Sequence, residues 1–196
     1  MSSIFDLVSS QLSGDAIARI GAKIGQDPQA TQKGVEAALA VLVGGLSKSS
    51  QKDGGAGLAK ALASGHDGSI LKDVGGYIDA GNLKDGQGII GHVLGGQADA
   101  AAKMIGASSG LGEGQASSLM AMLAPLVMGA IGKTQQGGPS SATALVGLLK
   151  GEESSLASKA PAAMSMIGGL LDADGDGDTD LSDIAAHGAG LLKKFF

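Results

Sequence analysis

Apolar residues recur every three to four positions through most of the first 150 residues, and glycines or polar residues interrupt them at short intervals. This spacing places apolar side chains on one face of an α-helix. The pattern therefore predicts an all-α protein, a bundle of short helices that end at glycines. The expected helices span residues 4–12, 13–24, 28–46, 56–63, two short segments within 66–96, then 98–105, 115–133 and 142–149.

Capping signals mark several of these helix ends. Side chains that accept backbone N–H groups favour helix starts, and glycine favours helix stops. The residues suited to these roles are Ser3, Ser13, Gly25, Asp27 (followed by Pro28) and Asp85. We expect the helix from Pro28 to fray in the polar stretch 47–55. Gly75-Gly76 should break the segment that follows, and the helix after Asp85 should begin near Gln87.

The longest apolar element, residues 115–133, has no charged residue between Gly114 and Gly132. Its continuous apolar part spans only about 13 residues, whereas a membrane-spanning helix needs about 20. We therefore expect a buried central helix, kinked at Pro125, with Leu123 and Val127 in the core. Membrane association remains the alternative.

A weak internal repeat has an offset of 85 residues. The stretch 39–48 aligns with 124–133, and each is preceded by a helix ending in Ile-Gly and followed by a short apolar helix. This indicates two similar halves, about 13–65 and 96–150, packed face to face.

The most specific motif lies near the C-terminus, in residues 172–183. Oxygen-bearing side chains occupy positions 1, 3, 5, 9 and 12, and Gly177 stands at position 6, where the chain must turn sharply. This is the ligand spacing of an EF-hand calcium loop, in which position 7 contributes a main-chain carbonyl. The predicted calcium ligands are Asp172, Asp174, Asp176, Asp178 (through its carbonyl), Asp180 and Asp183.

The loop departs from the common EF-hand pattern, because position 12 is an aspartate and no second loop exists in the chain. In this respect it resembles the single calcium loops of dockerin-type repeats. The alternative is a flexible acidic linker. Apolar periodicity on both sides favours a helix–loop–helix unit. We therefore divide the chain into a helical domain at 1–150, a Ser-rich connector at 151–160 and a calcium unit at 161–196.

Composition excludes some functions. The formal charge is −5, but six of the 19 acidic residues lie in the loop, and the rest nearly balance 14 bases. With no basic cluster, three Phe, one Tyr and no Trp, nucleic-acid binding is not expected. The absence of cysteine excludes disulfides and thiol catalysis. No secretory signal is recognisable at residues 1–10, which favours the cytoplasm, with signal-less export as the alternative.

Other candidate chemistry is sparse. His66, Asp67 and His92 could form a metal or acid–base group in an uncharacterised hydrolase. The alternative is that His66 ends one helix, Asp67 caps the next and His92 packs on a short helix. His187 is expected to be a surface or packing residue. We do not expect an enzyme.

Three separated motifs occur in order: Gly65-His66-Asp67-Gly68-Ser69-Ile70-Leu71, then Asp85-Gly86-Gln87-Gly88-Ile89-Ile90-Gly91-His92-Val93-Leu94-Gly95, then Leu123-Ala124-Pro125-Leu126-Val127-Met128-Gly129. Over about residues 15–150 the chain resembles a bacterial family catalogued as domain of unknown function nine-three-seven, to which YidB-like proteins are related. The resemblance implies an all-helical bacterial domain and carries no activity or catalytic residues. The leading hypothesis is a non-enzymatic, calcium-binding structural or interaction module. A protein partner or self-association would fit that role.

Overall fold

The computed structural model describes residues 3–12, 14–135 and 141–159. Within these ranges every regular element is a helix, which confirms the all-α prediction. The elements are α1 (Ile4–Gln11), α2 (Asp15–Ile24), α3 (Pro28–Lys52), α4 (Ala56–Gly65), η1 (Ser69–Lys72), α5 (Val74–Ala80), α6 (Lys84–Val93), η2 (Gly95–Gln97), α7 (Ala98–Ser109), α8 (Glu113–Gln135) and α9 (Ala142–Lys159).

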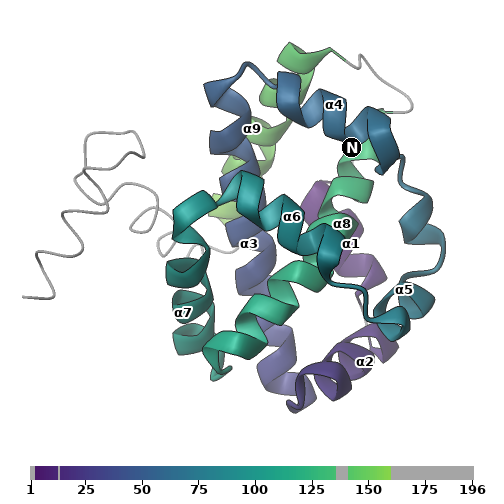
Figure 1. Cartoon of the computed structure of the whole chain (residues 1–196), viewed down its shortest axis with the longest axis vertical. Helices are drawn as coiled ribbons and strands as arrows, with labels where there is room; N and C mark the ends of the chain where they lie inside the picture. Colours follow the sequence, from purple (N-terminus) through teal and green to yellow (C-terminus); the bar gives the residue numbers. More distant parts are fainter. Residues whose placement is uncertain (1–2, 13, 136–140, 160–196) are drawn as a thin grey trace, which may run out of the picture.

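Helices α3 and α8 pack against each other at the centre of the bundle. The shorter helices surround them: α7 contacts both, α6 lies mainly on α8 and α9 on α3 (Figure 1). Residues 37–47 of α3 and 119–132 of α8 are all buried. A helix that is apolar on every side suits such a position. Leu123 and Val127 are fully buried, as expected.

One described helix, α8, is long and apolar enough to cross a membrane by length and composition. However, 78% of its most apolar window is buried inside the bundle. The core helix of a globular protein meets the same criteria, and α8 is the central element of the bundle. The helix continues through Pro125 without interruption.

The predicted helix starts at Ser3 and Asp27 are confirmed. The Ser3 hydroxyl accepts the N–H of Asp6, and the Asp27 carboxylate accepts those of Gln29 and Ala30. Gly25 ends α2 in the left-handed conformation (φ 69°). Ser13, the predicted cap of α2, lies outside the described residues. These local signals predicted the helix ends correctly because each cap needs only residues within a few positions along the chain.

The expectation that α3 frays after residue 46 was wrong, because the helix continues to Lys52. Ser47 and Ser50 are buried in the bundle and have hydrogen-bond partners there. The Ser47 hydroxyl donates to the Glu153 carboxylate on α9 (3.0 Å), and the Ser50 hydroxyl donates to the Ser47 carbonyl (2.8 Å). Tertiary contacts thus extend a helix whose local composition is polar.

The segment between α4 and α7 also differs from the expectation. Gly75-Gly76 lies inside α5 and does not interrupt the helix. The Asp73 carboxylate caps this helix by accepting the Gly76 N–H (2.8 Å). Helix α6 begins at Lys84, so Asp85 lies within its first turn and not before it. An acidic side chain is still favourable there, since the helix dipole is positive at this end.

Residues 151–159, expected to be a Ser-rich connector, belong to α9. The Glu152 side chain is buried, with 7% exposure, and its carboxylate accepts the N–H of Phe5 at the start of α1 (3.4 Å). Leu156 is fully buried. The first α9 turns past residue 150 are therefore part of the bundle. The predicted unit at 161–196 lies outside the described residues.

The offset of 85 residues recurs in the helix boundaries. Helices α2 and α7 end, and α3 and α8 begin, 85 residues apart. Gly25 and Gly110 both end their helices with positive φ, 69° and 83°. A Cβ at Gly21 or Gly106 would lie 2.8 or 2.7 Å from the carbonyl oxygen five residues later. The backbone thus makes the same close turn before each central helix.

Gln115 joins these two turns. Its Nε2 donates to the Ile24 carbonyl at the end of α2 (2.7 Å), while its Oε1 accepts from the Gln26 side chain (2.9 Å) and the Gly112 N–H (2.8 Å). One side chain at the start of α8 therefore satisfies polar groups from both turns. We call the Gln115 side chain and its three hydrogen-bond partners the Gln115 clasp. The clasp is half-buried, so its hydrogen bonds are partly shielded from competing water.

Replacing Gln115 with alanine should lower the free energy of unfolding by about 1–2 kcal/mol, because the Ile24 carbonyl and Gly112 N–H lose their partner. Urea unfolding followed by circular dichroism measures this change. Gln87→Ala, at an exposed position on α6, is the control and should alter stability by less than about 0.5 kcal/mol. Equal effects of the two substitutions would contradict the role assigned to the clasp.

Candidate functional site

The six predicted calcium ligands, residues 172–183, lie outside the described residues. Within the part of the chain that the structure describes, no group of three or more His, Cys, Asp or Glu side chains could hold a metal ion. The described residues therefore offer cavities, not metal centres, as candidate sites.

Both ring nitrogens of His66 have partners. Nδ1 lies 3.2 Å from the Ala61 carbonyl oxygen, and Nε2 lies 3.2 Å from Oδ2 of Asp85. The His66 side chain is only 17% exposed, whereas that of Asp85 is 57% exposed. Nε2 of His66 thus pairs with Asp85 of α6, whereas the Asp67 carboxylate accepts the Ser69 N–H. The imidazole thus connects the turn after α4 to the first turn of α6.

Asp67 has a separate role in this turn. Its Oδ1 accepts the Ser69 N–H at 2.9 Å, at the start of η1. Hydrogen bonds from Ser69, from the side chain first and then from the backbone, lower the pKa of the Asp67 carboxyl below its ordinary value. Asp67 was predicted to cap the element that follows, but the N-cap residue of η1 is Gly68, and Asp67 instead stabilises the turn that precedes it.

Tyr77 on α5 lies near Asp85. Burial disfavours the phenolate, and the negative charge of Asp85 adds to this effect, so that the pKa of Tyr77 rises to about 12. Its hydroxyl is buried without a hydrogen-bond partner among the described residues. The phenol therefore stays neutral at every physiological pH.

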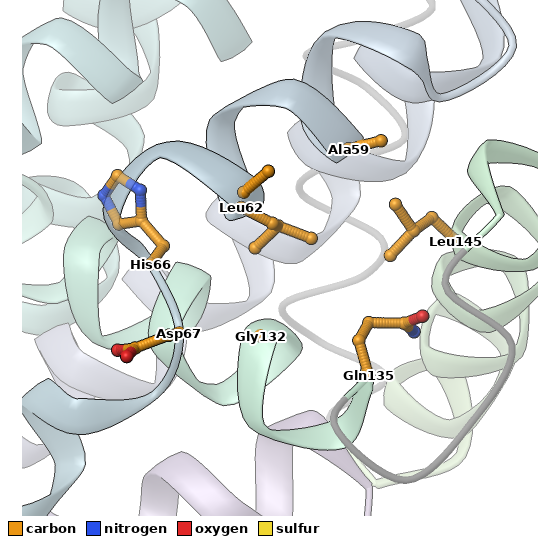
Figure 2. A pocket seen from close by; sticks show the side chains of 8 residues that line it. Ala59, Leu62, His66, Asp67, Gly132, Gln135 and Leu145 are labelled. Carbon is orange, nitrogen blue, oxygen red and sulfur yellow. The ribbon is translucent and has the colours of Figure 1, made fainter.

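A first cavity, here named the Gly132 pocket, has a volume of about 270 Å³. Figure 2 shows Leu62, Leu145 and Gln135 around it, with His66 and Asp67 at the opposite edge. The Oε1 atom of Gln135 is buried without a partner in the described structure. The pocket is lined by Ala59, Leu62, Ala63, His66, Asp67, Gly132, Gln135 and Leu145.

A second, larger cavity of about 630 Å³ lies among α3, α4, α6 and α8. We name it the α4–α6 cleft. Its lining includes Leu46, Lys52, Lys60, Ile89, His92 and Met128. His92 is exposed and belongs to this cleft, whereas His66 lines the Gly132 pocket. The structure thus places the three residues of the predicted hydrolase group, His66, Asp67 and His92, at two different cavities.

The three motifs quoted above meet on α8. A Cβ at Gly132 would lie 1.8 Å from the His66 carbonyl oxygen, and a Cβ at Gly86 would lie 1.8 Å from the Ala121 carbonyl oxygen. Neither distance leaves room for a side chain. The His66 turn and α6 therefore rest directly on the backbone of α8, and close packing requires glycine at Gly86 and Gly132.

The chain matches the family described as bacterial protein of unknown function, DUF937, over residues 6–134. The chain belongs to the DUF937 family. Among curated proteins and among solved structures, no match was found. The resemblance expected from the three motifs is confirmed, together with its all-helical character. The DUF937 match extends from α1 to nearly the end of α8, and so covers both central helices.

Sequence reasoning missed several polar groups that the DUF937 fold brings together. Asp85 was expected only to cap a helix, yet it pairs with His66. Gln135 lies beyond the expected helix 115–133, but in the structure it belongs to the last turn of α8 and lines the Gly132 pocket (Figure 2). Tyr77 was not selected. No local pattern marks these residues, because their partners come from other helices.

Proposed function

We propose that this DUF937 protein is a non-enzymatic, calcium-binding helical protein that serves as a structural or interaction module. The observation that carries the proposal is the acidic run at residues 172–183. Its carboxylates follow the ligand spacing of an EF-hand loop, and hard oxygen ligands are those that Ca²⁺ prefers. The dockerin-like loop would be appended to the DUF937 domain.

Electrostatics supports the same proposal. Six carboxylates occur within twelve residues that contain no Lys or Arg. If such a loop closed without a cation, the carboxylates would repel one another. A divalent cation relieves this repulsion, and Asp172, Asp174, Asp176, Asp180 and Asp183, with the carbonyl of Asp178, would supply its ligands. The shorter side chain of Asp183 and the lack of a second loop weaken binding.

Two observations favour this role over the alternatives. The hydrolase alternative requires His66 and His92 to act together, but they line different cavities, and both ring nitrogens of His66 are engaged. The membrane alternative requires α8 to leave the bundle, which would expose a largely buried helix. A binding role requires neither that His66 and His92 act together nor that α8 leave the bundle.

The proposal also includes two halves related by duplication, α2–α4 and α7–α9. The recurrence of the helix ends and of the glycine turns at an offset of 85 residues supports it. In this arrangement each half contributes one central helix, and neither half has a complete core alone.

Isothermal titration of chelator-stripped protein with CaCl₂ should show one site per chain, with a dissociation constant on the order of 10⁻⁵–10⁻³ M. A hundredfold excess over this constant should add about 2.7 kcal/mol of stability. The melting temperature should then rise by about 5–10 °C if the loop unfolds together with the core.

The double variant Asp172→Ala/Asp176→Ala should abolish the binding heat. Asp99→Asn/Glu113→Gln, which removes two exposed carboxylates from the helical domain, is the matched control and should bind calcium like the unmodified protein. Absence of both heat and thermal shift at several millimolar calcium would refute the proposal, as would loss of binding in the control.

A further inference from the structure

The α4–α6 cleft has an apolar floor. Leu46 of α3, Leu58 of α4 and Met128 of α8 are buried at its base, and the partly buried Ile89 and Val93 of α6 form one wall. Four helices contribute to this lining, so the cleft is a concave site and not a flat surface. Its volume, about 630 Å³, lies within the range of small-molecule sites, ~300–1,000 Å³.

The polar lining of the cleft carries more positive than negative charge. Lys52 and Lys60 line it together with one acidic residue, Asp53. The Asp53 carboxylate accepts the N–H groups of Gly55 (3.0 Å) and Gly57 (2.7 Å), which start α4. Its charge is thus directed at a helix N-terminus. Lys60 on α4 thus supplies the positive charge that attracts an anion to the cleft.

We propose that the α4–α6 cleft binds a single-chain amphiphilic anion, such as a fatty-acid carboxylate. The apolar chain occupies the floor formed by Leu46, Leu58 and Met128, and the anionic headgroup lies toward Lys60. The combination of an enclosed apolar floor and a cationic rim is the basis of this assignment. It is independent of the calcium loop, because no residue beyond 159 is involved.

An acidic amphipathic peptide would share part of this chemistry. The cleft favours the single chain, because its volume is that of a small-molecule site. The full-length protein allows the two to be compared directly.

The test is isothermal titration of the full chain, without calcium, with laurate below its micelle concentration. We expect saturable binding of one laurate per chain. Dodecyltrimethylammonium has the same chain and the opposite charge, and it should show no saturable binding. Lys60→Glu should weaken laurate binding about threefold or more, since it replaces an attraction with a repulsion.

Ser64→Trp, at an exposed position in the lining, should abolish laurate binding by filling the cleft. Lys103→Glu, an exposed charge reversal on α7, is the control and should leave binding unchanged. Circular dichroism establishes that each variant is folded. If Ser64→Trp does not fold, the laurate binding of Lys60→Glu decides the test. Equal binding of both surfactants, no saturable laurate heat, an unaffected folded Ser64→Trp, or binding only of an acidic helical peptide would overturn the proposal.

Discussion

Gly86→Ala should lower the free energy of unfolding by about 3 kcal/mol or more. The added Cβ would lie 1.8 Å from the Ala121 carbonyl oxygen and 2.6 Å from its carbonyl carbon. Both atoms belong to the backbone of the central helix, so no side-chain rotation relieves the clash. Helix α6 must move away from α8, and the contacts between these two helices loosen along their length.

Gly88→Ala is the matched control for this substitution. Gly88 lies two residues further along the same helix, is exposed, and has nothing within 4 Å of the position a Cβ would take. Alanine there should raise stability by up to about 1 kcal/mol, because it is the better helix former. Chemical denaturation of both variants makes the comparison. A Gly86→Ala protein as stable as Gly88→Ala would contradict the close packing of α6 on α8.

Pro125 accounts for the place where α6 approaches so closely. Proline has no N–H, so the carbonyl of Ala121, four residues earlier in α8, lacks its usual helical donor. This is the same carbonyl that Gly86 contacts. Two of the DUF937 motifs, one on α6 and one on α8, are therefore linked through a single backbone group.

Leu123→Ala should cost about 2–5 kcal/mol, the second large effect that we expect. Leu123 is fully buried in the middle of α8, where the surrounding helices hold the cavity open. Thermal or urea unfolding monitored by circular dichroism measures the loss. Leu148→Ala makes the same change at a partly exposed position on α9 and should cost clearly less.

The same experiment tests the membrane alternative. Protein that folds around a buried α8 should remain soluble without detergent, and Leu123→Ala should destabilise it by the amount given above. A change below about 0.5 kcal/mol, or protein recovered only with membranes, would contradict the buried position of this helix.

The fold could be predicted where local chemistry decides it. Ser3, Gly25 and Asp27 set helix ends through contacts within a few residues, and the apolar stretch around Leu123 forms the predicted core helix. Prediction from the sequence failed where contacts between residues far apart in the chain set the extent of a helix. At the end of α3 the Ser47 hydroxyl donates to Glu153 of α9, 106 positions away, and the second half of α9 buries Leu156.

The candidate site shows the same limit. His66 is marked by its motif, but its partner Asp85 comes from another helix, and the α4–α6 cleft arises only when four helices pack together. By contrast, the proposed calcium loop is continuous in sequence, so its ligand spacing can be read directly. Its residues lie outside the described ranges, and calcium titration is the test that bears on them.

The separation of the two central helices has a consequence for synthesis on the ribosome. Residues 37–47 of α3 are buried mainly by elements encoded later, and α8 begins 85 residues after α3. At about 5–20 residues per second, this interval takes roughly 4–17 s. During this time the nascent chain displays an uninterrupted apolar segment that its own fold cannot yet cover, and this segment is where a ribosome-associated chaperone would bind.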